Sequence, residues 1–159
     1  MKSVISRLSA TFAIAAAALL AVPFGASAQE APSYNYIGIG GGDNGFVVNS
    51  KFSIADNISL RPEIATDFDF DDDEDISYVA PITYDFNTIG SGKAAFNPFI
   101  GAGIAGDIGD NSDDEIEFAL VAGTDYRFAD RFVANGSINY TPFADDDELG
   151  FTVGVGFLF

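Results

Sequence analysis

The sequence Gly150-Phe-Thr-Val-Gly-Val-Gly-Phe-Leu-Phe159 alternates between two kinds of residue. Every second position is large and apolar, namely Phe151, Val153, Val155, Phe157 and Phe159. The positions between them are Gly or Thr, apart from Leu158. Because successive side chains of a β-strand point to opposite faces, this pattern predicts a strand with one strongly apolar face.

The same alternation recurs in seven earlier segments, which stretches rich in Asp, Asn and Gly separate from one another. Most are about 9–11 residues long, the length that a membrane-crossing strand needs. The predicted strands are Tyr34–Gly42, Phe46–Ile54, Ile58–Phe68, Ile76–Phe86, Asn97–Asp107, Glu115–Phe128, Phe132–Tyr140 and Gly150–Phe159. We therefore predict an all-β fold, an eight-stranded antiparallel up-and-down transmembrane β-barrel. Glycines in the first segment leave the facing of Tyr36 and Ile37 undecided.

Composition favours a barrel in lipid. Hydrophobic residues make up 48% of the chain and 16 residues are Phe, yet 24 residues are acidic. A membrane barrel accommodates both, because apolar side chains face lipid and polar ones face the lumen. The predicted strand ends carry two aromatic groups, Phe46, Phe68, Tyr78, Phe118, Tyr140 and Phe151 at one rim, and Phe52, Tyr84, Phe86, Tyr126, Phe128, Phe132 and Phe159 at the other. Such girdles are typical of membrane barrels. The alternative is a soluble sandwich or lipocalin-like barrel with its apolar face inward.

Residues 1–28 are predicted to be a cleaved signal peptide. Lys2 and Arg7 precede an apolar, Ala-rich run, and Ala26-Ser27-Ala28 has the form of a cleavage site. The apolar run is shorter than the roughly 20 residues of a membrane-spanning helix. The mature part, residues 29–159, is then a single barrel domain in the outer membrane of a Gram-negative cell, reached by Sec-type export through the periplasm.

Charge separates when these strands run up and down with both chain ends in the periplasm. Eighteen of the 24 acids then lie in the outer half with no base. The periplasmic half holds the other six acids, Glu63 among them, and all five bases of the mature part, Lys51, Arg61, Lys93, Arg127 and Arg131. The mature net charge of −19 argues against a nucleic-acid partner.

A weak internal repeat supports the same arrangement. Residues 52–58 match residues 126–132 at an offset of 74, and residues 71–74 match residues 145–148 at the same offset. Equivalent turns should therefore lie on the same side of the barrel, with an even number of strands between them.

These features together resemble the small outer-membrane barrel family, such as the transmembrane domain of outer membrane protein A and its shorter relatives. The signal peptide, the eight alternating segments and the final strand ending in Phe159 carry the resemblance. In this family the assembly machinery is thought to read such an ending. The resemblance therefore implies an assembly signal at Phe151, Val153, Val155, Phe157 and Phe159, and as partners the barrel assembly machinery and outer-membrane lipid with lipopolysaccharide. We expect a monomer.

The sequence holds little catalytic chemistry. The chain has no His and no Cys, which excludes Ser-His and Cys-His nucleophilic sites. A carboxylate pair acting as acid and base is possible in principle, but a solvated acidic loop explains the acids better. The segment Gly38-Ile-Gly-Gly-Gly-Asp43 lacks the Lys and the helix of a phosphate-binding loop. We expect that the protein is not an enzyme and has no cofactor.

The acidic loops are candidates for weak contacts with Ca²⁺ or Mg²⁺ through carboxylate oxygens. The residues concerned are Asp71, Asp73, Asp75, Asp145, Asp146, Asp147 and Glu148. They lack the order of an EF-hand, so nonspecific surface charge is the alternative and no dedicated metal site is expected.

Six charged residues fall on the predicted lumen face, Lys51, Arg61, Glu63, Asp85, Asp125 and Arg127. They should neutralise one another in a packed interior, because eight strands enclose only enough space for side chains. We therefore expect a structural or surface-interaction barrel without a wide pore. A narrow small-solute or ion channel and a cation-responsive adhesin or receptor are the alternatives.

Overall fold

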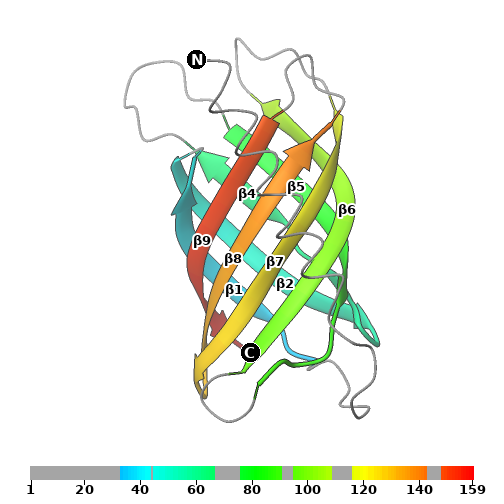
Figure 1. Cartoon of the computed structure of the whole chain (residues 1–159). Coiled ribbons are helices and arrows are strands. Elements are labelled where there is room, and N and C mark those ends of the chain that lie inside the picture. The colour runs from blue at the N-terminus through cyan, green and yellow to red at the C-terminus, as the bar shows by residue number, and fades with distance from the viewer. Residues whose placement is uncertain (1–32, 44, 67–75, 91–94, 109–115, 143–147) are drawn as a thin grey trace, which may run out of the picture.

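The computed structural model describes residues 33–43, 45–66, 76–90, 95–108, 116–142 and 148–159. The strands form one antiparallel barrel (Figure 1): β1 (Tyr36–Gly42), β2 (Gly45–Ala55), β3 (Ile58–Leu60), β4 (Glu63–Thr66), β5 (Ile76–Asp85), β6 (Phe96–Ile108), β7 (Glu117–Ala129), β8 (Phe132–Thr141) and β9 (Glu148–Leu158). β1 pairs with both β2 and β9, which closes the barrel. No helix in the described segments is long and apolar enough to cross a membrane.

β3 and β4 are two parts of one strand, because both pair with β2 on one side and β5 on the other. The barrel is therefore the predicted eight-stranded, all-antiparallel one. The sequence pattern predicted one continuous strand here, and the interruption falls at Arg61 and Pro62. Pro62 has no backbone N–H to donate to the ladder. The gap is bridged by Ser50 N, which donates to Pro62 O at 3.0 Å, and by Arg61 N, which donates to Pro81 O at 3.0 Å.

The two ends of the barrel differ. One end, the turn rim, carries the hairpins at Asp56–Asn57 and Asp130–Arg131 and the carboxy terminus (Figure 1). The other end, the loop rim, is where the described parts of four strands stop, at Gly42, Thr66, Ile108 and Thr141. Asn57 has a φ of 62°, a left-handed conformation that Asn adopts more readily than most residues in tight turns.

The sequence repeat has a structural counterpart. The β2–β3 pairing shifts register between Ser53 and Ala55, and the β7–β8 pairing shifts between Arg127 and Ala129. These positions are related by the same offset of 74 residues. Both hairpins lie at the turn rim, so the prediction that equivalent turns share one side is confirmed for this pair; the second matched pair, residues 71–74 and 145–148, lies outside the described residues except for Glu148.

The outer surface of the barrel is apolar. Large side chains such as Ile39, Ile82 and Val153 are 59%, 55% and 59% exposed, while their strand neighbours point inward. At the turn rim, aromatic side chains lie against one another, with ring centroids 6.5 Å apart for Phe52 and Phe159 and 5.7 Å apart for Phe132 and Phe157. The predicted apolar face of the strands and the aromatic girdle at this rim are therefore confirmed. The apolar face points outward, which excludes the lipocalin-like alternative.

Inward-facing glycines make room for large side chains inside a narrow barrel. A Cβ atom on Gly156 would lie 2.6 Å from Cδ2 of Tyr36, and one on Gly123 would lie 2.5 Å from Cζ of Phe99. Both rings therefore lie directly over a glycine of a neighbouring strand. Tyr36 is 3% exposed and Ile37 is 55% exposed, which settles the facing of the first strand.

Candidate functional site

Four charged side chains meet inside the barrel, in the half nearer the turn rim. Lys51, Arg61, Asp85 and Asp125 are 0%, 6%, 4% and 0% exposed. They come from β2, the link between β3 and β4, β5 and β7, and each occupies an inward position of its strand. Two bases and two acids give no net charge, as a buried group of charges requires. We call these four residues the charge cluster.

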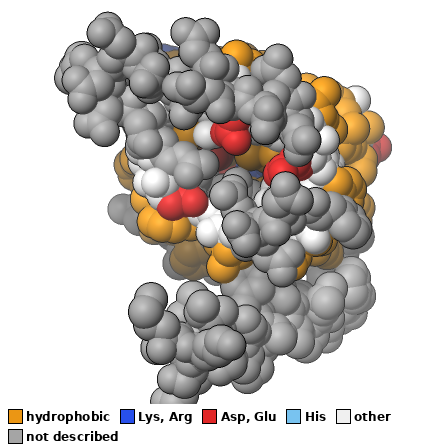
Figure 2. Space-filling view, turned by 90° about the horizontal axis from the view of Figure 1, so that it is seen from above, with side chains coloured by type: hydrophobic (Ala, Val, Ile, Leu, Met, Phe, Trp, Pro, Cys, Tyr) orange, Lys and Arg blue, Asp and Glu red, His pale blue; other side chains and the backbone are white. Residues whose placement is uncertain are grey.

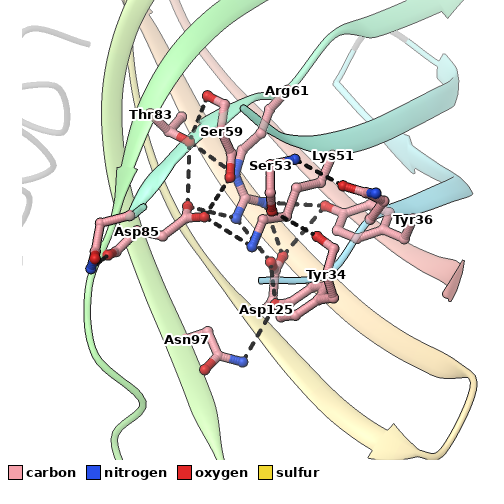
Figure 3. A network of polar contacts seen from close by, with 12 residues as sticks. Tyr34, Tyr36, Lys51, Ser53, Ser59, Arg61, Thr83, Asp85, Asn97 and Asp125 are labelled. Atoms are coloured by element: carbon pink, nitrogen blue, oxygen red, sulfur yellow. Dashed lines mark hydrogen bonds and ion pairs between the residues drawn. The ribbon is translucent and has the colours of Figure 1, made fainter. Parts of the chain in front are cut away.

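Arg61 is the centre of the charge cluster (Figure 3). Its Nη1 and Nη2 donate to the two oxygens of Asp125 at 3.2 and 2.9 Å. Nη2 also lies 3.0 Å from Oδ1 of Asp85, and Nε donates to Thr83 Oγ1 at 3.1 Å. The guanidinium carbon lies 3.6 Å from the centre of the Phe99 ring. A planar guanidinium suits this arrangement because it donates in a fixed fork and also stacks on aromatic faces.

Asp85 and Lys51 form the second part of the charge cluster. Lys51 Nζ lies 2.9 Å from Asp85 Oδ2, and Ser59 Oγ donates to that same oxygen at 2.5 Å. The ammonium group also lies 3.8 Å from the centre of the Tyr34 ring, within the range of a cation–π contact. Burial of Lys51 is thus offset by one carboxylate and one aromatic face.

Two tyrosines complete the surroundings of Asp125. Tyr34 Oη donates to Asp125 Oδ2 at 2.7 Å, and Tyr36 Oη donates to Oδ1 at 3.4 Å. With the two bonds from Arg61, the carboxylate accepts four hydrogen bonds. Side chains from β1, β2, β5 and β7 therefore meet across the interior and hold one another in place. The charge cluster and these tyrosines fill the lumen in the half nearer the turn rim.

The space that remains on the loop side is small. The described residues there line a cavity of about 30 Å³ beside Arg61 and a second of about 10 Å³ nearer the loop rim. Such volumes hold one or two water molecules and no larger solute. Within the described residues, no group of three or more His, Cys, Asp or Glu side chains is placed to hold a metal ion. At the level of the charge cluster, side chains therefore fill the lumen.

Comparison with known proteins concerns the fold. No family model matches the chain, and no curated protein matches it. The N-terminal β-barrel domain of Pseudomonas aeruginosa OprF is 20% identical, covering 82% of this chain and 100% of that chain, with a TM-score of 0.60. The Yersinia pestis outer membrane protein Ail in a phospholipid bilayer nanodisc is 14% identical, covering 80% and 100%, with a TM-score of 0.54. The crystal structure of Ail, the attachment invasion locus protein, gives 17% identity over 82% and 100%, with a TM-score of 0.51.

The fold is that of the small, outer membrane protein A-like barrels. It confirms the resemblance drawn from the sequence. In this outer-membrane barrel fold the residues of the predicted assembly signal all lie on the outer face, with Phe151, Val153, Val155, Phe157 and Phe159 between 42% and 66% exposed. Their role in assembly stays a prediction.

The acidic candidates for cation contacts lie largely outside the described residues. This is so for Asp71, Asp73, Asp75, Asp145, Asp146 and Asp147, while Glu148 is the first residue of β9. The described acids Asp43 and Asp107 do lie at the loop rim and are exposed. Figure 2, seen from this rim, shows acidic side chains around a central hollow and hydrophobic ones around the outside.

Two residues differ from the sequence predictions, Arg127 in its predicted lumen position and Glu63, which does face the lumen, in the half of the barrel assigned to it. Arg127 is exposed at the turn rim, with its guanidinium carbon 5.7 Å from the centre of the Tyr34 ring. Glu63, assigned by the charge count to the periplasmic half, instead accepts a hydrogen bond from Thr152 Oγ1 at 2.6 Å. Because Thr152 pairs with Gly42 at the loop rim, the carboxylate of Glu63 lies on the loop side of the charge cluster.

The uncharged partners of the charge cluster were not predicted from the sequence. Tyr34, Tyr36, Ser59, Thr83 and Phe99 contact its charges. Ser59 lies two residues before Arg61, and Thr83 lies two residues before Asp85. The alternation of the strands therefore indicated that both side chains face the lumen. Phe99 had no such signal, because an inward Phe opposes the apolar-outward rule of the barrel.

Proposed function

We propose that this protein is an integral outer-membrane barrel with a structural or surface-interaction role and a closed lumen. The observation that carries the proposal is the combination of an apolar outer surface with an interior occupied by a neutral, hydrogen-bonded charge cluster. The apolar outer surface suits contact with lipid. The charge cluster leaves no passage through the lumen for a solute of appreciable size.

The outer surface supports a membrane location. Large exposed apolar patches are rare on soluble monomers, whereas here apolar side chains cover the outward positions of every strand from β1 to β9, with Gly, Ala and Thr among them. Aromatic side chains at the turn rim suit a membrane–water interface. Outer-membrane lipid and lipopolysaccharide are the proposed surroundings, reached by export with the signal peptide, and the barrel assembly machinery is the proposed partner for the last strand.

The closed interior supports a structural role over transport. A solute passing through would have to separate Arg61 from Asp125 and Asp85, which are joined by contacts of 2.9 and 3.0 Å. A non-enzymatic role fits the same interior, since the carboxylates of Asp85 and Asp125 are bound by cationic side chains and hydroxyl groups. Surface interaction is assigned to the acidic loop rim, where weak Ca²⁺ or Mg²⁺ contacts are part of the proposal.

Single-molecule conductance tests this proposal. The mature protein, purified in detergent and shown to be folded by its heat-modifiable gel migration, is inserted into planar lipid bilayers. We expect no conductance comparable with that of a general porin, because the charge cluster remains intact across the lumen. A stable, large and frequent channel would contradict the proposal and favour the channel alternative.

A further inference from the structure

A tyrosine that belongs to no strand lies inside the turn-rim half of the lumen. Tyr34 precedes β1, which begins at Tyr36, and its ring nevertheless lies in the barrel interior (Figure 3). The rings of the two tyrosines are stacked, with centroids 6.4 Å apart and planes at 26°. Tyr34 is half-buried, whereas Tyr36 is 3% exposed, so Tyr34 is the outer layer of the stack. We call residues 33–35 the entry segment.

The side chain of Tyr34 contacts the charge cluster at several points. Its Oη donates to Asp125 Oδ2 at 2.7 Å and accepts a hydrogen bond from Asn97 Nδ2 at 3.4 Å. The ammonium group of Lys51 lies 3.8 Å from the ring centre, and the guanidinium carbon of Arg127 lies 5.7 Å from it. Lys51 is fully buried, whereas Arg127 is exposed at the turn rim. The ring therefore lies between the charge cluster and the opening of the barrel at the turn rim.

The backbone of the entry segment is held mainly through side chains. Ser53 Oγ donates to Tyr34 O at 3.2 Å, and Ser53 N donates to Asn35 Oδ1 at 2.9 Å. One main-chain bond, from Phe159 N to Asn35 O at 3.1 Å, joins the segment to the last strand. The ladder pairs of β1 begin only at Tyr36. A chain end held by so few bonds opens locally at little cost, while a fully paired strand opens only together with its neighbours.

We propose that the entry segment is a removable plug for the turn-rim mouth of the lumen, with the Tyr34 ring covering Lys51 and Asp125. Withdrawal of the segment breaks its own bonds and leaves every strand pair of the barrel in place. Water then reaches the charge cluster from the turn rim. This inference rests on the proposed function and deepens it, because it names the segment that closes the lumen on this side.

Withdrawal of the plug opens a pocket, not a channel. Arg61 stays joined to Asp85 and Asp125 at 3.0 and 2.9 Å, and neither contact involves the entry segment. The charge cluster therefore forms the floor of the opened pocket and still separates it from the loop side. Hydration of the buried charges thus depends on the position of a short segment at the start of the barrel.

The amine of Lys51 reports directly on the plug, because residues 29–159 contain only one other lysine, Lys93. The mature barrel, folded in detergent, is treated with acetic anhydride, and acetylation of each lysine is followed by peptide mass spectrometry with Lys93 as the internal reference. Acetylation of Lys51 should be slow in the parent protein. Tyr34→Ala should accelerate it at least about 10-fold, whereas Tyr34→Phe, which keeps the ring, should stay within about threefold of the parent rate.

Val121→Ala is the matched control for a general loss of stability. Val121 is a buried residue of β7 on the loop side of Asp125, so its truncation should destabilise the barrel without altering the plug. Each variant is first shown to be folded by its heat-modifiable gel migration. The Lys51 rate of Val121→Ala should stay near that of the parent. The inference is overturned if Val121→Ala or Tyr34→Phe is acetylated as fast as Tyr34→Ala, or if Tyr34→Ala reacts at the parent rate.

Urea separates withdrawal of the plug from unfolding of the whole barrel. Below the unfolding transition, the Lys51 rate of the parent protein should change little with urea, because opening of the short entry segment exposes little surface. A steep rise in step with global unfolding would show that Lys51 is exposed only when the barrel opens, which contradicts the plug. The conductance test of the closed lumen is independent of these results, since the ion pairs of Arg61 cross the lumen whether or not Tyr34 is in place.

Discussion

Substitution of Asp125 by Asn should destabilise the barrel far more than its small change in shape suggests. The side chain is fully buried and accepts bonds from Arg61, Tyr34 and Tyr36. Asn has nearly the same volume but no charge, and its amide group presents N–H donors where Arg61 also donates. The charge cluster would then hold Arg61 and Lys51 against the single carboxylate of Asp85.

The magnitude follows from the loss of one partner of a buried ion pair. Such a loss typically costs about 3–5 kcal/mol, because the remaining charge stays buried without compensation. With a slope of about 2 kcal/mol per molar urea, the unfolding midpoint should fall by about 2 M. A loss of about 3–5 kcal/mol is a large part of the unfolding free energy of a domain of this size.

The folded fraction at each urea concentration can be measured by heat-modifiable gel migration in lipid vesicles. Asp130→Asn is the matched control, because it removes a carboxylate from an exposed turn and should change stability by no more than about 0.5 kcal/mol. The double variant Arg61→Met/Asp125→Leu removes both charges and should recover most of the loss. The reasoning is refuted if Asp125→Asn costs less than about 1 kcal/mol, or if the double variant is as unstable as the single one.

Two further predictions concern glycine positions and the carboxy terminus. Gly156→Ala should lower the unfolding free energy by about 1–3 kcal/mol, because the new methyl group meets the Tyr36 ring. Gly136→Ala, whose Cβ would meet neighbouring atoms only at 3.8–3.9 Å, should be tolerated, and equal urea midpoints for the two variants would disprove the packing argument. Deletion of Phe159, which is 66% exposed at the turn rim, should sharply reduce the amount of barrel assembled in cells, while the purified variant still folds in detergent. Leu158→Ala should have a milder effect on assembly in cells. Assembly of both variants at the level of the parent protein would disprove the assembly signal.

The sequence was sufficient to predict the architecture because alternation defines both the strands and their faces. β5, for example, spans Ile76–Asp85 where the pattern indicated residues 76–86. The break at Pro62 was not predicted, although a proline inside a strand is a signal for one. The facing of β1 was not predictable either, because Gly38, Gly40 and the following glycines carry no side-chain pattern; packing of Tyr36 on Gly156 determines it.

The interior was predictable only in part. The alternation of inward and outward residues placed Lys51, Arg61, Asp85 and Asp125 in the lumen. Which of these side chains contact one another depends on the tilt of the strands and on the height of each residue along the barrel. Glu63 is the clearest example, because its neighbours in the sequence gave no indication that its side chain contacts Thr152 across the barrel. Such contacts across the interior depend on strand stagger, which no local pattern encodes.

The hydrogen bonds of Asp125 have a consequence for the order of folding. Tyr34 and Tyr36 lie 91 and 89 residues before Asp125 in the chain. In an open sheet, β1 forms one edge and β9 the other. Tyr34 and Tyr36 then lie far from Asp125 on β7, so their hydrogen bonds to it are absent. They form only when β1 and β9 meet at the seam. An incompletely closed intermediate would therefore carry an under-bonded carboxylate, and completion of the seam and of the polar interior should be one cooperative, late step.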